Sequence, residues 1–363
     1  MAENVKYYDW QKTLSYDADV TMVVGARGYG KTFGLRRQCI ADYKKDGSRF
    51  VEVVRYRNEL SGVAEGYFGR LEEMPENENF LFRTDNRYAY IANKPKDYEE
   101  KVNNGEKIKV HWKVCGYFVA MTDEQKLKKR TFNHVRRIIL DECIISRNDR
   151  YHNYLPNEFA ILANIVDTVS RERAGTKSTR PRVYLLGNAC DFGNPYFAAY
   201  NVTSDIGYGY YWFKGKTFLL HRLQDKSYAE QKITGTVAGR MLAGTMDAKI
   251  AADNEFIGMS DDFVCKKTKT AKFLFGIHFN GKHYGVWVDY INGMYFVTDK
   301  IPNNSTAIYY LSNADAKVNY IAARKTSNLF KTFGEVYYLG LLFYETVDIK
   351  VGFQEVLRYF GIY

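Results

Sequence analysis

The sequence predicts an α/β fold organised around a nucleotide-binding loop. Two segments support this prediction most strongly. Residues 20–32 (VTMVVGARGYGKT) join an apolar strand to a glycine-rich loop and the start of a helix, and residues 138–142 (IILDE) form an apolar strand that ends in two carboxylates. Further apolar runs at 50–54 and 182–187 are typical of buried strands in a sheet covered by helices on both faces.

The segment 20–32 has the G-x-x-x-x-G-K-[ST] pattern of a phosphate-binding loop. Its glycines let successive backbone N–H groups turn inward on an anion, and the following helix adds the positive end of its dipole. Chance would produce the pattern on the order of 0.01 times in a chain of this length. We expect Lys31 to reach the β- and γ-phosphates and the Thr32 hydroxyl to bind Mg²⁺. The predicted cofactor-binding residues of the loop are Gly25, Ala26, Arg27, Gly28, Tyr29, Gly30, Lys31 and Thr32.

The two carboxylates that end the strand 138–140 predict the reaction. Asp141 is placed to hold Mg²⁺ together with Thr32, and Glu142 to orient and polarise a water for attack on the γ-phosphate. Asn188, which follows the strand 182–187, is a polar residue that can sense the γ-phosphate or the attacking water. Hydrolysis of a nucleoside triphosphate is therefore the predicted activity, with Glu142, Lys31 and Asn188 as catalytic residues.

ATP is favoured over GTP as the nucleotide. The residues 188–191 (NACD) match the guanine-reading N-K-x-D pattern only superficially, because the lysine is absent. No D-x-x-G switch follows Asp141. At the N-terminus, Trp10 and Gln11 could stack on adenine and hydrogen-bond its edge, or the aromatic residues there could pack the terminal segment onto the sheet.

Composition excludes several classes of protein. No apolar run approaches the ~20 residues that span a bilayer, and the first ten residues lack the apolar core of a signal peptide, so we expect a cytosolic protein without a membrane partner. The 5 cysteines are odd in number and form no CxxC pair, which argues against a disulfide framework and a zinc site. A net charge of +10 is compatible with a polyanionic partner.

Basic residues outside the loop have two interpretations each. Arg171 and Arg173 follow the helix predicted from 156, where they either complement the helix dipole or reach a neighbouring subunit's nucleotide as an arginine finger. Two lysine groups are either solvated surface or contacts to DNA phosphates, and the first could also reach a neighbour's nucleotide. These groups include Lys128 and Lys129 before the acidic strand, and Lys266, Lys267 and Lys269 later in the chain.

Composition and turn signals predict two domains joined by a connector. We expect an ATPase domain at 1–222, a helical linker at 223–255 and a C-terminal α+β domain at 256–363. The first should contain a β-rich insertion at 80–121 and an edge hairpin at 207–223. The second should contain strands at 273–279, 284–290 and 294–298, joined by Asn-Gly turns, and then helices at 314–325 and 327–344.

Taken together, the loop at 25–32, the Asp141–Glu142 couple, the arginine-bearing helix and the C-terminal meander resemble the DNA-packaging ATPases, or encapsidation proteins, of small protein-primed podophages. The resemblance implies an additional-strand (ASCE, RecA-like) P-loop NTPase core followed by a vestigial nuclease domain of RNase H-like fold. It also implies a homopentameric ring, transiently docked on the portal of a procapsid in the host cytoplasm, that binds a packaging RNA and moves double-stranded DNA inward.

By the same resemblance, Lys31, Thr32 and Asp141 bind ATP and Mg²⁺, Glu142 is the catalytic carboxylate, and Arg171 or Arg173 is the trans-acting finger. Lys128 is a weaker trans-acting candidate. Nuclease activity is not expected, because the strand 273–279 carries no acidic residue and Asp289 stands nearly alone, whereas two-metal chemistry needs several carboxylates. The alternatives are a P-loop nucleotide or small-molecule kinase, and a regulatory ATPase with a nucleic-acid or capsid docking module.

Overall fold

The computed structural model describes residues 8–145, 154–171, 180–188, 192–203, 206–223, 237–242, 262–324 and 328–362. The chain divides into two compact units. The first comprises Met1–Cys190 with Gly207–Glu255, and the second comprises Asp191–Ile206 with Phe256–Tyr363. Helix α8 (Pro195–Tyr200), which the sequence placed in the ATPase domain, thus groups with the second unit.

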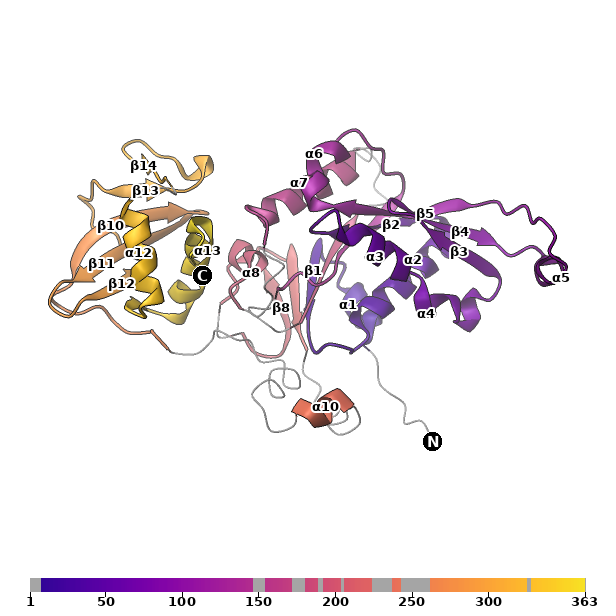
Figure 1. The fold of residues 1–363 in the computed structure, drawn as a ribbon, viewed down its shortest axis with the longest axis horizontal. Coiled ribbons are helices and arrows are strands. Elements are labelled where there is room, and N and C mark those ends of the chain that lie inside the picture. The colour runs from indigo at the N-terminus through magenta and orange to yellow at the C-terminus, as the bar shows by residue number, and fades with distance from the viewer. Residues whose placement is uncertain are drawn as a thin grey trace. The chain divides into compact units, whose positions relative to one another are not determined.

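A nine-stranded sheet forms the centre of the first unit, with the strand order β3-β4-β5-β2-β6-β7-β1-β9-β8 (Figure 1). The strands are β1 (Val20–Val24), β2 (Arg49–Val54), β3 (Phe80–Thr84), β4 (Tyr88–Asn93), β5 (Lys113–Ala120), β6 (Val135–Leu140), β7 (Arg182–Gly187), β8 (Gly209–Phe213) and β9 (Phe218–Arg222). The β-rich segment 80–121 and the edge hairpin at 207–223 are confirmed as β3–β5 and β8–β9.

The central strands run parallel, and their order sets the positions of the functional segments. Strand β1, which leads into the phosphate loop, pairs in parallel with β7 on one side and with β9 on the other. Strand β6, which leads to the acidic couple, pairs in parallel with β7 and β2. Strand β7 therefore lies between β1 and β6, and the carboxyl ends of all three meet at one edge of the sheet.

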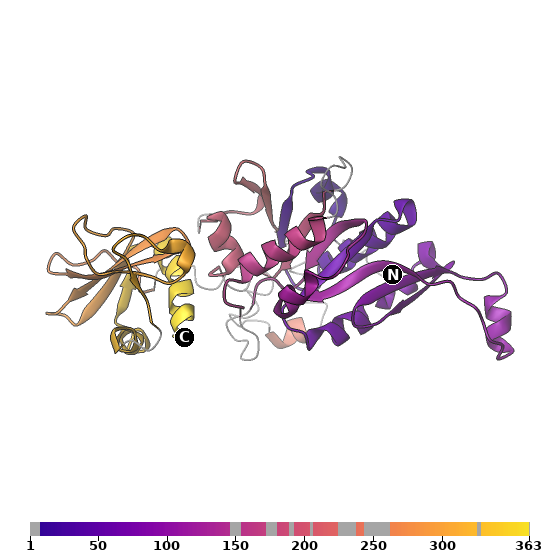
Figure 2. The same cartoon turned by 90° about the horizontal axis from the view of Figure 1, so that it is seen from above.

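Helices cover this sheet and bury its strands. The helices of the first unit are α1 (Trp10–Ser15), α2 (Lys31–Asp46), α3 (Glu59–Gly66), α4 (Gly69–Glu72), α5 (Tyr98–Asn103), α6 (Glu124–Leu127), α7 (Glu158–Ser170) and α10 (Val237–Leu242), with 3₁₀ turns η1 (Pro75–Asn77) and η2 (Met121–Asp123). Apolar residues of α1 to α4 form one core with Phe50, Phe118 and Ile139 of the sheet. Figures 1 and 2 show α7 apart from this group, and α5 at the tip of an arm beyond β4 and β5.

The second unit is built on a six-stranded sheet with the order β14-β13-β10-β11-β12-β15. Its strands are β10 (Lys272–Phe279), β11 (Lys282–Asp289), β12 (Met294–Thr298), β13 (Ile308–Tyr310), β14 (Ile321–Ala322) and β15 (Leu342–Tyr344). Strands β10 to β12 form an antiparallel meander, and the remaining neighbours pair in parallel. The three predicted strands of the meander are confirmed.

The helices of the second unit differ from the prediction. The helix expected at 314–325 is wrong, because this stretch forms the 3₁₀ turn η4 (Asn313–Asp315) and the edge strand β14. The helix expected at 327–344 is α12 (Asn328–Tyr338), and the apolar run after it pairs with β12 as β15 instead of continuing the helix. Helix α13 (Val347–Phe360) was not predicted, although Thr346 caps its first turn and Gly361 ends it with a positive φ. No helix among the described residues has the length and apolarity needed to cross a membrane.

Candidate nucleotide-binding site

The loop between β1 and α2 has the geometry of an anion cradle. Gly28 and Gly30 adopt φ values of 87° and 78°, in the left-handed region that favours glycine, and α2 begins directly after Gly30. Lys31 is buried, and its ammonium group donates to the carbonyl oxygens of Gly25 at 2.9 Å and Ala26 at 2.8 Å. The lysine charge is therefore fixed inside the loop, beside the amino end of a sixteen-residue helix.

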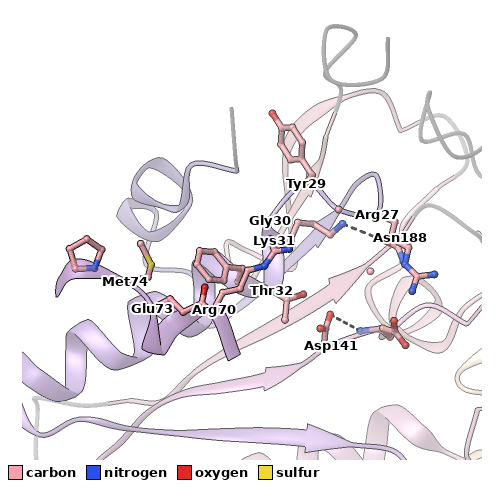
Figure 3. Close-up of a pocket in the computed structure, with 15 residues that line it drawn as sticks. Arg27, Tyr29, Gly30, Lys31, Thr32, Arg70, Glu73, Met74, Asp141 and Asn188 are labelled. Atoms are coloured by element: carbon pink, nitrogen blue, oxygen red, sulfur yellow. Dashed lines mark hydrogen bonds between the residues drawn. The ribbon is translucent and has the colours of Figure 1, made fainter. Parts of the chain in front are cut away.

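The predicted site residues come together around one cavity of about 630 Å³. Figure 3 shows the Lys31 side chain directed at Asn188, and Thr32 beside Asp141. Lys31 and Thr32 begin α2, directly after the loop that follows β1, and Asp141 and Asn188 directly follow β6 and β7; these residues meet because β1, β7 and β6 are neighbours. The predicted residues that line the cavity are Arg27, Gly28, Tyr29, Gly30, Lys31, Thr32, Asp141, Glu142 and Asn188.

Asn188 and Asp141 are tied to their neighbours by specific hydrogen bonds. The Lys31 ammonium group donates to the Asn188 side-chain oxygen at 3.3 Å, which connects the end of β7 to the phosphate loop (Figure 3). The Asp141 carboxylate accepts from the Glu142 backbone N–H at 2.9 Å. Thr32 and Asp141 offer a hydroxyl and a carboxylate at the same cavity, and this oxygen donor set fits Mg²⁺ held together with substrate phosphates.

Glu142 has a strained backbone that a buried arginine holds in place. Its φ is 50°, in the left-handed region, which is uncommon for a residue other than glycine and costs of order 1–3 kcal/mol. The Arg55 guanidinium group donates to the carbonyl oxygens of Glu142 at 2.8 Å and Cys143 at 2.6 Å. Its Nε donates to both carboxylate oxygens of Glu158, each at 3.0 Å. Arg55 therefore links the end of β2, the turn at Glu142 and the first residue of α7.

A second buried ion pair fixes α2 against β2. Arg36 on α2 pairs with Glu52, whose side chain is 1% exposed. Burial alone would lower the pKa of Arg36, but the charge and hydrogen bond of Glu52, together with Tyr67 and Asp141, outweigh burial, and the net shift is upward. Burial raises the pKa of Glu52, and Arg36 opposes that shift while the charge of Asp141 adds to it. The pair thus connects α2 to β2 and senses the charge of Asp141.

Trp10 and Gln11 do not line the phosphate-loop cavity. Trp10 is 5% exposed, and its indole N–H donates to the Lys31 carbonyl oxygen at 2.9 Å, so it packs α1 against the start of α2. Both residues line a separate cavity of about 540 Å³ with α2 residues such as Arg37. Their position supports the packing alternative for the N-terminal aromatics more than adenine stacking.

The basic residues proposed to act outside the cavity are exposed. Arg171 directly follows α7 and is paired with Asp167 at 2.9 Å. Lys128 donates to Gln125 at 2.8 Å, and Lys129 is exposed beside it. Arg173 lies outside the described residues. None of these three described side chains lines the phosphate-loop cavity.

The lysine cluster of the second unit lies in the segment directly before β10. Lys266 and Lys269 are exposed, whereas Lys267 is partly buried with its ammonium group 4.4 Å from the centre of the Trp287 ring. Asp289, at the end of β11, accepts hydrogen bonds from Thr268, Thr270 and the backbone N–H of Ile291. The Thr268 hydroxyl and the other donors lower the pKa of Asp289 well below its usual value. Asp289 therefore organises a turn. In the described part of the chain, no group of three or more His, Cys, Asp or Glu side chains could hold a metal ion.

Sequence reasoning missed several residues of the site. Arg55 follows the strand 49–54 directly, so its place at the carboxyl edge of the sheet could have been inferred from the strand end alone. Gly187 likewise ends β7, whereas the others come from α2 and from the segment around α4, whose position depends on tertiary packing. The cavity residues absent from the prediction are Phe33, Arg70, Glu73, Met74, Pro75 and Gly187.

Comparison with known proteins identifies the family. The model of the family described as "Podovirus DNA encapsidation protein (Gp16)" matches residues 2–359. The chain is 30% identical over 322 residues to the DNA packaging proteins of Bacillus phage PZA and Bacillus phage phi29, covering 89% of this chain and 87% of each relative. A chain from a solved structure of the bacteriophage Phi-29 viral genome packaging motor assembly matches with a TM-score of 0.64 and 28% identity, covering 98% of this chain and 99% of that one.

A second solved structure, the Phi-28 gp11 DNA packaging motor, shares the fold with a TM-score of 0.66 at 18% identity, over 99% of both chains. These matches extend over nearly the whole chain and include both units. A packaging ATPase is also what the site geometry indicates, because the glycine loop and the Asp141–Glu142 couple line one cavity at the carboxyl ends of β1, β6 and β7. The chain belongs to the podovirus Gp16 family of DNA encapsidation proteins, which are DNA packaging ATPases.

Proposed function

We propose that this packaging ATPase drives double-stranded DNA into a preformed capsid by Mg²⁺-dependent ATP hydrolysis in a homo-oligomeric ring. The observation that carries the proposal is that Lys31, Thr32, Asp141 and Glu142 line one cavity beside a glycine loop of cradle geometry. A kinase needs the loop but has no use for a carboxylate directly after the metal-binding aspartate. The strand order, with β7 between β1 and β6, supports an additional-strand core.

The residues at the phosphate end of the cavity, and Arg55 beside them, have defined tasks. The phosphate-loop N–H groups and Lys31 bind the triphosphate, and Thr32 with Asp141 would hold Mg²⁺, which neutralises phosphate charge when bound. Glu142 accepts a proton from the attacking water as the water oxygen bonds to the γ-phosphorus, while the bond from that phosphorus to the β,γ-bridging oxygen breaks and ADP leaves. Arg55 keeps the Glu142 backbone in its strained conformation through the carbonyl oxygen. Asn188, bonded to the Lys31 ammonium group, senses loss of the γ-phosphate.

A residue from a neighbouring subunit is proposed to complete each site, so that every subunit needs a neighbour and the subunits assemble as a ring. Arg171 is exposed and outside its own cavity, which supports a role in trans, and Arg173 and Lys128 remain further candidates. A guanidinium group inserted at a neighbour's γ-phosphate would stabilise the transition-state charge. ATP would then tie two subunits together, and hydrolysis would loosen the interface in a cycle of grip and release. We expect five subunits.

The second unit is proposed as an inactive nuclease-like domain. The order β12-β11-β10-β13-β14, with an antiparallel meander and parallel flanking strands, supports an RNase H-like fold. Engagement of Asp289 in a turn supports the absence of nuclease chemistry. Exposed Lys129, Lys266 and Lys269, with Lys267, are proposed to contact DNA phosphates, so that the grip is independent of sequence and sensitive to salt. Packaging RNA and the portal of the procapsid are the further proposed partners, in the host cytoplasm.

Mixing two inactive variants tests the proposal. Glu142→Gln should bind ATP without hydrolysing it, and Arg171→Ala should remove the finger. If the arginine acts in trans, mixed rings should regain DNA-stimulated ATPase activity at interfaces that pair an intact glutamate with an intact arginine. Arg180→Ala, at another exposed arginine, is the matched control and should stay active alone. Normal hydrolysis by Glu142→Gln would refute the catalytic assignment, and mixtures without recovered activity would refute the finger at Arg171.

A further inference from the structure

The phosphate-loop cavity has a second end whose residues have no task in hydrolysis. Figure 3 shows Arg70, Glu73 and Met74 gathered on the side away from Asp141 and Asn188. Phe33, the first residue after Thr32, and Pro75 also line the cavity. These residues come from α2 and from the segment of α4 to η1, which pack together in the core of the first unit.

The size and composition of the cavity suit a whole nucleotide. Its volume of about 630 Å³ lies in the range of pockets that hold cofactors and exceeds what three phosphates require. Once the triphosphate lies over the loop, the nucleoside must extend away from Asp141 and Glu142, because the γ-phosphate faces them. Phe33, Met74 and Pro75 offer apolar surface there for the flat face of a base. Trp10 is buried in a different contact and does not reach this cavity.

Two charged side chains, those of Arg70 and Glu73, lie at this end of the cavity. Among the described residues, no hydrogen bond or ion pair forms to the side chain of Arg70 or of Glu73, although they lie three positions apart on one short helical segment. An aromatic base accepts a guanidinium group over its face, so Arg70 can cover the base from the solvent side. A carboxylate accepts hydrogen bonds but donates none when ionised. Glu73 therefore matches the 6-amino group of adenine and repels the 6-oxo group of guanine.

We propose that Phe33, Arg70, Met74 and Pro75 form the base subsite of this ATPase and that Glu73 selects adenine by accepting a hydrogen bond from its 6-amino group. The inference rests on the proposed binding of a triphosphate at Lys31 and Thr32. It assigns nucleotide specificity to the segment 70–75 and to the first turn of α2.

Equilibrium binding of nonhydrolysable analogues tests the assignment on the full chain. Wild-type protein should bind adenylyl imidodiphosphate at least about tenfold more tightly than guanylyl imidodiphosphate, as expected for a hydrogen bond gained with one base and a repulsion met with the other. Glu73→Gln, whose amide can donate to guanine, should reduce this ratio about tenfold. Arg70→Ala should weaken both analogues by a similar factor. Glu72→Gln is the matched control, because Glu72 is exposed on the same helix and does not line the cavity.

The outcomes separate this inference from the function on which it rests. An unchanged ratio in Glu73→Gln, or the same loss of discrimination in Glu72→Gln, would overturn the role of Glu73. Wild-type protein that binds both analogues equally would also overturn it while leaving the ATPase site intact. Wild-type protein that binds neither analogue would instead contradict the phosphate-loop site itself. Thermal melts of each variant confirm that the fold is retained.

Discussion

Replacement of Arg55 by methionine should damage stability and catalysis through two separate contacts. Arg55 and Glu158 are 7% and 1% exposed, and the arginine donates to both oxygens of the carboxylate. Arg55→Met leaves the Glu158 carboxylate buried without the arginine charge, a loss of about 3–5 kcal/mol in the free energy of unfolding. It also removes the donor to the Glu142 carbonyl oxygen, so the turn at Glu142, proposed to be catalytic, is no longer held in its strained conformation.

A double variant separates the two effects. In Arg55→Met with Glu158→Leu the buried charge is gone, and an apolar pair of similar volume should restore stability to within about 2 kcal/mol of wild type. The ATPase turnover rate should remain about 100-fold below that of wild type, because a displacement of the Glu142 carboxylate by about 1 Å lowers the rate by about that factor. Denaturant unfolding and DNA-stimulated ATPase assays on the same preparations measure both quantities.

Two results would refute this reasoning. If the double variant hydrolyses ATP at the wild-type rate, Arg55 does not position Glu142, and its role is confined to neutralising Glu158. If Arg55→Met unfolds at the same denaturant concentration as wild type, the pair is not a stabilising contact in solution. Arg57→Met is the matched control, because Arg57 is a nearby arginine that is exposed and whose Nε lies 3.7 Å from Oδ2 of Asp123.

Three further predictions concern the sheet and α1. Trp10→Phe removes the indole donor to the Lys31 carbonyl oxygen and should cost about 1 kcal/mol of unfolding free energy while ATP affinity, measured by calorimetry, changes less than about threefold; a larger loss of affinity would return Trp10 to the base-binding role. Burial, with the charge of Lys12, lowers the pKa of His221 from 6.5 to about 4. The stability that the neutral imidazole allows should therefore be fully present above pH 6.5 and fall as the pH drops towards 4. The denaturant midpoint should change less with pH over this range in His221→Asn than in wild type. Equal changes in the two proteins would contradict the lowered pKa of His221. Gly116→Ala would place a Cβ 2.1 Å from the buried Phe50 ring and should destabilise by about 1–3 kcal/mol in thermal melts, whereas Gly62→Ala, with open space around it, should not; similar effects at the two positions would disprove the clash.

The sequence was sufficient for the residues that local motifs carry. Lys31, Thr32, Asp141 and Glu142 follow directly from two short segments, and the rule that carboxyl ends of parallel strands share an edge brings them together. Asn188 was found in the same way. These positions depend on chain-local chemistry and on a strand order that few topologies satisfy.

The residues that the sequence did not supply depend on packing between distant segments. Arg55 meets Glu158 across 103 positions, and nothing in either local pattern indicates the partner. Glu73 enters the cavity because the segment around α4 packs on α2, which no periodicity reveals. The helix expected at 314–325 was wrong because a short apolar run there pairs with β13, and parallel pairing overrides a weak helical preference.

The pairing of β9 with β1 has a mechanical consequence for a motor. Strand β9 ends at Arg222, and the next residue, Leu223, donates its N–H to the Val24 carbonyl oxygen at 2.8 Å, directly before the phosphate loop. A load applied to the chain at Leu223 would act on the backbone bonds between β9 and β1, from Phe218 to Arg222. These bonds lie directly before Gly25, so the pairing of β9 would brace the strand that leads into the loop.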